Sequence, residues 1–291
     1  MAEKPRVERG ATKPLEPRRR GPLRSVFGAE TALRTAEAAL GALLFLVLIQ
    51  GALGFTLLDP VFWNRFQRSL WRGFQGTLYY SAIVVPASVV IGFFAGWARV
   101  SRYRSLSWPV SVYVDLIRGI PPIVLVIFAF LFVPALLPDQ FNTQEAALLF
   151  SAIALAVHSG SYQAEIFRAG FQSVPRGQLE AAQAIGLDNW TIMGSVVLPQ
   201  AFRLSLPPLG NELASLVKDT SLLGALGAVE LVALGQEFNQ QLVIFGGQLG
   251  WVFAVWTAVA ALYFVLTFAV TRGLLFIEKR FRVPGMEGVS V

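Results

Sequence analysis

Residues 173–199, SVPRGQLEAAQAIGLDNWTIMGSVVLP, form the longest polar-containing interval between strongly apolar runs of this chain. The pattern predicts a helix, an elbow and a second helix. Pro175 suits the first position of a helix, and Gly186 suits the left-handed residue that ends one. Asp188 can cap the second helix by accepting hydrogen bonds from its first free amides, and Pro199 is expected to end the interval.

The first of these predicted helices has two unlike sides. Leu179, Ala182 and Ile185 form an apolar stripe at helical spacing, with Glu180 and Gln183 beside it. Small residues at 181, 182 and 184 leave one side slim enough to enter the groove of another protein. A short helix between apolar runs predicts a segment that transmits movement, as a lever, or closes a passage, as a plug. It does not predict a catalytic loop.

The composition indicates a membrane protein. Of the 291 residues, 55% are hydrophobic and 14% are charged, which is too apolar for an ordinary soluble domain. The chain has no cysteine and therefore no disulfide, thiol nucleophile or thiolate metal site. Its single histidine, His158, excludes a histidine metal cluster. We expect no metal, no cofactor and no catalytic residue.

Six apolar runs are long enough to cross a membrane as helices. A cleaved signal peptide is the alternative for the first run, but this run is 19 residues long and lies far from the start. In the second run, Pro86 predicts a kink and Gly92-x-x-x-Gly96 permits close approach of another helix. The expected spans are Leu40–Leu58, Phe74–Ala98, Ile120–Leu137, Ala146–Ile166, Ala201–Leu234 and Leu249–Phe276.

The basic residues give the expected orientation. Only Arg65, Arg68 and Arg72 fall on one side of the predicted membrane. Because positive residues stay in the cytoplasm, both termini and the 173–199 interval are expected there. The same distribution explains the net charge of +6 without nucleic-acid binding. On the cytoplasmic side fall nineteen of the 24 lysines and arginines, within residues 1–34, 99–104, 168–203 and 272–282.

These patterns predict four segments of unequal character. The first is Pro-, Arg- and Gly-rich without apolar periodicity, which predicts a disordered cytoplasmic tail. The segments are the basic tail at 1–30, an additional transmembrane helix with its outer loop at 31–70, the transmembrane domain at 71–282 and a cytoplasmic tail at 283–291.

The 173–199 interval also resembles a known signature. Its spacing matches the EAA motif of the permease subunits of bacterial ATP-binding-cassette (ABC) importers, with Val196 where the family usually has Ile. The likeness covers about residues 71–282 and is closest to the polar amino-acid branch. It rests on Glu180-Ala181-Ala182, Gly186, Val196 and Leu198-Pro199, and on the runs 118–122, 162–168, 173–178, 206–211 and 218–222.

The resemblance implies an all-α integral membrane fold, with six transmembrane helices around the family's five-helix core and a cytoplasmic coupling helix. The implied partners are an ABC ATPase subunit dimer, an extracytoplasmic solute-binding protein and a second permease, either another copy or a homologue. The resemblance also implies a location in the lipid of the bacterial inner membrane. The implied substrate is an amino acid. ATPase-coupling roles fall on Glu180, Ala181, Ala182, Gly186, Leu198 and Pro199.

ATP is expected to be hydrolysed by another chain. A P-loop needs a Gly-Lys pair to hold phosphates, and none of the four lysines, Lys4, Lys13, Lys218 and Lys279, follows a glycine. Leu125 stands where many members of the family carry Gln, so the particular amino acid does not follow from the resemblance.

Polar and ionisable residues gather in the fifth predicted span. Such residues inside a membrane segment line a cavity or pair with one another. A zwitterionic amino acid needs a cation for its carboxylate and an acceptor for its ammonium group, and this cluster offers both. A self-neutralising network at a subunit interface is the alternative. The candidate substrate-pathway residues are Asn211, Glu212, Ser215, Lys218, Asp219, Thr220 and Ser221, of which Asn211, Ser215 and Lys218 share one helix face.

Smaller features of the fourth span complete the candidates. Glu165 and Arg168, three residues apart, predict an intrahelical ion pair. Tyr162 and Gln163 are further pathway candidates, whereas His158 is expected to be a hydrogen-bonded core residue.

Two classes of function remain. One is the importer permease. The other is a stand-alone secondary transporter or channel that uses the charges of the fifth span, which inverted internal repeats would favour. No convincing repeat pair occurs in the sequence.

Overall fold

The computed structural model describes residues 59–244 and 249–281, the last four by backbone only, together with isolated positions between 37 and 52. The chain divides into two compact units, residues 1–56 and 57–291. All features below belong to the second unit. Most of the predicted first span lies outside the described residues. The predicted tails at 1–30 and 283–291 also lie outside them.

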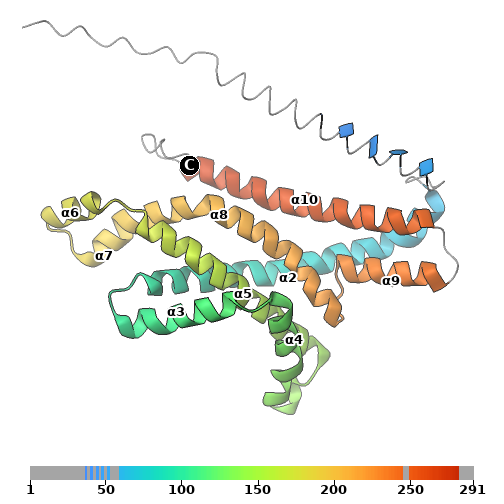
Figure 1. The fold of residues 1–291 in the computed structure, drawn as a ribbon, viewed down its shortest axis with the longest axis horizontal. Coiled ribbons are helices and arrows are strands. Elements are labelled where there is room, and N and C mark those ends of the chain that lie inside the picture. The colour runs from blue at the N-terminus through green and yellow to red at the C-terminus, as the bar shows by residue number, and fades with distance from the viewer. Residues whose placement is uncertain are drawn as a thin grey trace, which may run out of the picture. The chain divides into compact units, whose positions relative to one another are not determined.

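The described residues fold into helices, and no strand occurs among them (Figure 1). Short 3₁₀ segments and one π-helical turn interrupt the longer helices. In chain order the elements are α2 (Pro60–Arg99), α3 (Arg104–Arg118), α4 (Pro122–Phe132), η1 (Pro134–Leu136), η2 (Asp139–Phe141), α5 (Gln144–Gln172), α6 (Arg176–Ala184), α7 (Asn189–Ile192), the π turn η3 (Met193–Val197), α8 (Leu198–Asp219), η4 (Thr220–Leu226), α9 (Leu231–Ile244) and α10 (Leu249–Phe281).

The start of α2 lies fourteen residues before the predicted Phe74 and corrects that boundary. Asp59 caps the helix, because its carboxylate accepts a 2.9 Å hydrogen bond from the amide of Val61, and Pro60 occupies the first helical position. The same carboxylate accepts a 3.2 Å hydrogen bond from the indole of Trp251. The beginning of α2 is thereby fixed to the beginning of α10.

The most extensive helix contact joins α2 to α5. A methyl group added at Gly92 would lie 2.5 Å from Cβ of Gln163, and one at Gly96 would lie 2.7 Å from the carbonyl oxygen of Ala164. Only glycine fits at both positions, so the close approach that the sequence predicts is confirmed.

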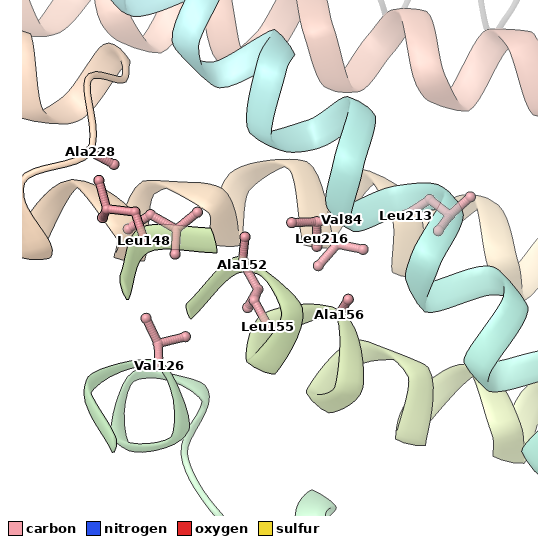
Figure 2. Close-up of a cluster of buried hydrophobic side chains, with 10 residues drawn as sticks. Val84, Val126, Leu148, Ala152, Leu155, Ala156, Leu213, Leu216 and Ala228 are labelled. Atoms are coloured by element: carbon pink, nitrogen blue, oxygen red, sulfur yellow. The ribbon is translucent and has the colours of Figure 1, made fainter. Parts of the chain in front are cut away.

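A core of apolar side chains lies where α2, α4, α5 and α8 meet (Figure 2). The figure shows Val84 of α2 near Leu216 of α8, and Val126 of α4 below Leu148 of α5. All members are nearly or fully buried. They are Val84, Val126, Leu148, Ala152, Leu155, Ala156, Leu213, Leu216, Leu223 and Ala228.

The third predicted span, Ile120–Leu137, corresponds to α4 with η1, and α3 meets this segment at an angle of 102°, as Pro121 and Pro122 favour. The fifth does not continue as one helix to Leu234. The chain leaves α8 at Thr220, passes through η4 and turns at Gly227, whose φ of 93° is left-handed.

Two described helices are long and apolar enough to cross a membrane alone, Pro60–Arg99 and Leu249–Ile277, and the bent α3–α4 pair passes the same test as one broken span. The predicted count of six spans stays a prediction. In the most apolar windows of the two long helices only 22% and 17% of the residues are buried within the chain. The remaining apolar surface requires lipid or another subunit.

Candidate functional site

The predicted helix–elbow–helix is present at one end of the second unit (Figure 1). Its first helix, α6, begins at Arg176, so Pro175 lies at the cap and not at the first helical position. Ala182 is buried, and Leu179 packs beside it on a cluster that includes Phe171 and Ile192. The elbow is therefore held on the ends of α5 and α7 by its apolar side.

The turn between α6 and α7 forms as predicted, with a left-handed Gly186 and an Asp188 cap. Gly186 has a φ of 84°, and its amide bonds to the carbonyl of Gln183 at 2.9 Å. Asp188 caps α7 by accepting from the amides of Trp190 at 3.0 Å and Thr191 at 3.4 Å. Chiefly the hydrogen bond from the Thr191 hydroxyl, and then these amides, lowers the pKa of the Asp188 carboxyl.

The outer side of the elbow is open to solvent. Glu180, Ala181 and Gly186 are exposed, and no atom lies within 4 Å of where a Cβ on Gly186 would be. Ile185, predicted on the apolar stripe, and Trp190 are both 77% exposed. An exposed surface with two large apolar side chains is typical of a protein-interaction site.

The prediction that Pro199 ends the interval is wrong. The chain passes from α7 through the π turn into α8 without leaving a helical path. In this wider turn the amide of Leu198 bonds to the carbonyl of Met193, five residues earlier. The wide turn relieves the clash that a proline causes in a regular helix, so Pro199 lies inside the helical rod. Leu198 and Pro199 are partly buried at this junction.

The residues predicted for the substrate pathway lie along α8 and at its end. Asn211 and Lys218 are exposed on the shared face, and Ser215 is partly buried. Lys218 takes part in no salt bridge of the described residues. Of the remaining members, Glu212, Asp219 and Ser221 are partly buried, while Thr220 is buried and donates to the carbonyl of Val217 at 2.8 Å.

A chain of polar contacts reaches Glu212 from the interior. The hydroxyl of Ser159 donates to Oε1 of Glu212 at 2.8 Å, and Nε2 of Gln163 donates to that hydroxyl at 3.1 Å. Gln163 also donates to the hydroxyl of Ser88 at 2.8 Å. These contacts join α2, α5 and α8 through the buried Ser88, Ser159 and Gln163 and the partly buried Glu212. Ser88 and Ser159 were not among the predicted pathway residues, since a serine in an apolar helix carries no distinguishing pattern.

The predicted ion pair of Glu165 and Arg168 is present, and it belongs to a larger group. Arg99 at the end of α2 donates to Glu165 at 2.6 Å and lies 3.6 Å from a carboxylate oxygen of Asp115 on α3. Arg168 also donates to Gln172 at 2.6 Å. The ends of α2, α3 and α5 are thus joined by charge. His158 is buried, and its Nε2 has no partner among the described residues.

Glu230 is a buried acidic residue that the sequence analysis did not single out. Its carboxylate accepts from the amides of Val232 at 2.7 Å and Ala233 at 2.5 Å, which caps α9, and from the hydroxyl of Tyr263 at 3.0 Å. A Glu three residues after Gly227 that caps a helix could have been found by its position before the apolar run. The contact with Tyr263 of α10 joins segments far apart in sequence.

Fold and site together define a helical membrane protein that carries an exposed helix–elbow–helix. A family model described as the binding-protein-dependent transport system inner membrane component matches residues 88–283, and the chain belongs to that family. It is therefore a multi-pass protein of the bacterial inner membrane and a transport subunit, not an enzyme.

Two named relatives support the amino-acid branch of the family. The L-cystine transport system permease protein TcyB of Bacillus subtilis (strain 168) is 34% identical over 229 residues, which are 77% of this chain and 93% of the relative. The glutamine transport system permease protein GlnP of Escherichia coli (strain K12) is 34% identical over 215 residues, 74% of this chain and 93% of the relative. The predicted relationship to amino-acid importer permeases is confirmed.

Solved structures confirm the predicted permease fold. A crystal structure of an amino acid ABC transporter with histidines matches at a TM-score of 0.63 with 27% identity, covering 77% of this chain and 99% of that one. The inward-facing MetNI methionine ABC transporter matches at 0.61 with 22% identity and the same coverage, which supports the fold alone. ATP hydrolysis in such importers belongs to a separate subunit.

Proposed function

We propose that this chain is the permease subunit of an ATP-driven importer that moves polar amino acids from outside into the cytoplasm by alternating access. The observation that carries the proposal is the elbow, with Glu180 exposed, Ala182 anchored on the core and Gly186 in the left-handed turn. A rigidly attached helix with one free side can transmit force from a partner to α5 and α8.

The free side of the elbow would contact an ABC ATPase subunit dimer. Glu180 offers a carboxylate, Ala181 is small enough for close approach, and Ile185 and Trp190 offer apolar area. Movement of α6 would reach α5 through the cluster around Phe171 and reach α8 through the continuous helical path past Leu198 and Pro199.

The substrate would pass along the exposed face of α8. Lys218 would attract the carboxylate of a zwitterionic amino acid, and Glu212, held by Ser159, would accept from its ammonium group. Asn211, Ser215, Asp219, Thr220 and Ser221 supply further polar groups along the same helix and its end. The cystine and glutamine permeases among the relatives support a polar amino acid as cargo.

The further partners follow from the class of transporter and from surfaces that the chain leaves uncovered. They are an extracytoplasmic solute-binding protein, membrane lipid and a second permease, either another copy or a homologue. The sparse burial of the apolar windows in α2 and α10 leaves room for lipid and a second subunit. The basic-residue distribution supports a cytoplasmic position for the elbow and both termini. Residues 71–282 would form the core domain, and 31–70 an additional helix with its loop.

Reconstitution with its ATPase and binding protein tests this function. Vesicles loaded with ATP and Mg²⁺ on the ATPase side should take up labelled glutamine or cystine, and uptake should stop without ATP. A matched set of vesicles lacking the ATPase should show no flux under a proton or sodium gradient. Ion-driven flux in the ATPase-free vesicles would instead support a stand-alone secondary transporter.

A further inference from the structure

A groove with several polar side chains lies on α2 close to the point where its apolar stretch begins. The groove has a volume of about 330 Å³ and runs along the helix face beside α9 and the loop that precedes it. Five of its lining residues come from α2 and one from that loop. They are Arg72, Gln75, Gly76, Tyr79, Tyr80 and Val229.

The floor of the groove is rigid. A methyl group on Gly76 would lie 1.7 Å from the carbonyl oxygen of Val229, so backbone lies directly on backbone at this point. At the next residue of α2, the hydroxyl of Thr77 accepts a 3.2 Å hydrogen bond from the amide of Leu231. Glu230, which follows Val229 in the loop, accepts a hydrogen bond from the hydroxyl of Tyr263. The groove is therefore part of the packing of the fold and not a gap between loose segments.

The lining offers hydrogen-bond donors and no carboxylate. Arg72 contributes a guanidinium, Gln75 an amide NH₂, and Tyr79 and Tyr80 contribute hydroxyls. Arg72 is exposed and forms no salt bridge within the described residues. Arg65, two turns earlier, lies instead over the ring of Trp251, 5.8 Å from its centroid. The free cation and the neutral donors beside it suit an anion with several acceptor oxygens.

The position of the groove along α2 fits the boundary of a bilayer. Arg72 stands two residues before Phe74, where the apolar stretch begins, and Tyr79 lies about 11 Å further along the helix. Trp71, 59% exposed, stands beside the arginine. Arginine at the headgroup level with Trp and Tyr around it is the usual composition of a membrane–water interface. Val229, which lines the groove and is 43% exposed, offers apolar surface beside these residues.

We propose that this groove binds the phosphate and glycerol of an anionic phospholipid. Arg72 holds the phosphate, Gln75 and Tyr79 donate to glycerol and ester oxygens, and an acyl chain lies along Val229. The bound lipid would occupy the junction of α2 with the loop at Glu230. Inorganic phosphate has the same charge chemistry and is the other source that the test separates.

Native mass spectrometry of the full chain in neutral detergent tests the site. The protein is titrated with phosphatidylglycerol and with phosphatidylcholine of identical acyl chains. Retention of phosphatidylglycerol should be about fivefold higher, the effect expected of one arginine near a membrane surface. Arg72→Gln should abolish the preference, and Arg72→Lys should keep part of it. Arg102→Gln is the matched control, since Arg102 also lies beside a tyrosine, Tyr103, but lines no part of this groove.

Equal retention of the two lipids by the unchanged protein, or a preference that survives Arg72→Gln, would overturn the proposal. Displacement of phosphatidylglycerol by millimolar inorganic phosphate would assign the site to free phosphate and also overturn it. Should Arg72→Gln fail to accumulate, Gln75→Leu tests the same groove by removing a neutral donor. Brominated phosphatidylglycerol should quench the tryptophan fluorescence of the unchanged protein more than that of Trp71→Phe. This difference locates the bound lipid beside Trp71 without mass spectrometry.

Discussion

The hydroxyl of Ser159 on α5 lies 2.8 Å from Oε1 of Glu212 on α8 and donates a hydrogen bond to it. Because Gln163 extends this contact to Ser88, the acceptor proposed for the substrate ammonium group is positioned by three helices. Movement of any of these helices would displace the carboxylate, which links the conformation of the bundle to the affinity of the site.

Ser159→Ala should therefore weaken substrate binding. Loss of a hydrogen bond to a charged group costs about 1.5–3 kcal/mol, so KM for ATP-driven uptake should rise by about one to two orders of magnitude with a smaller change in kcat. The measurement is the concentration dependence of uptake in reconstituted vesicles. Ser151→Ala is the control, because Ser151 is also buried on α5 but bonds only to the carbonyls of Ala147 and Val126. Equal effects of the two variants would contradict a role at Glu212.

Gly186→Val should leave the protein in the membrane but uncouple transport from ATP hydrolysis. The surroundings are open, so the cost comes from the left-handed backbone, about 1–2 kcal/mol or more for a branched side chain. Uptake per ATP hydrolysed should fall about five- to thirtyfold. Gly177→Val, also at a position with open surroundings and without a positive φ, should retain most coupling. Normal uptake by Gly186→Val would show that the elbow does not need this turn.

The cap of α7 should weaken in acid. The pKa of Asp188 is lowered in the folded chain, so its stabilisation is complete above the ordinary pKa of about 3.9 and is lost as the pH falls through the lower folded value. Hydrogen-exchange protection factors of the Trp190 and Thr191 amides, corrected for intrinsic exchange at each pH, should fall below pH of about 4. In Asp188→Asn the protection should be lower at neutral pH and nearly independent of pH. A pH dependence that persists in the variant would assign it to another group.

Gly76→Ala should destabilise the junction between α2 and the loop before α9. The added methyl would overlap the carbonyl of Val229, and such overpacking costs about 1–3 kcal/mol. The Tm in detergent should fall by several degrees. Gly273→Ala on α10 is the control, since no atom lies within 4 Å of its Cβ position and alanine favours a helix interior. An unchanged Tm for Gly76→Ala would mean that the junction can move apart freely.

Features with local causes could be predicted from the sequence. The left-handed Gly186, the Asp188 cap and the pair of Glu165 with Arg168 depend on residues no more than three or four positions apart. The close approach at Gly92 was also predictable, because only the absence of a side chain was needed.

Features that depend on distant segments were not predictable. The π turn that keeps Pro199 inside a helix is a response to backbone geometry, and no residue pattern marks it in advance. The contacts of Gln163 with Ser88 and of Glu230 with Tyr263 join residues 75 and 33 positions apart. Polarity within an apolar run marked Glu212 as a candidate, but only the fold shows that Ser159 holds it.

The central claim, that the elbow couples this permease to a separate ATPase, has a direct test because the chain contains no cysteine. A single cysteine is placed at the exposed Ala181, and a control cysteine at the exposed Asn64 near the start of α2. Tagged protein is cross-linked in native membranes and purified in mild detergent. We expect Ala181→Cys to capture a protein that carries the phosphate-binding motif G-x-x-x-x-G-K-[ST], and Asn64→Cys to capture none. Absence of such a protein from the Ala181→Cys adducts, with the variant normally inserted, would contradict the account.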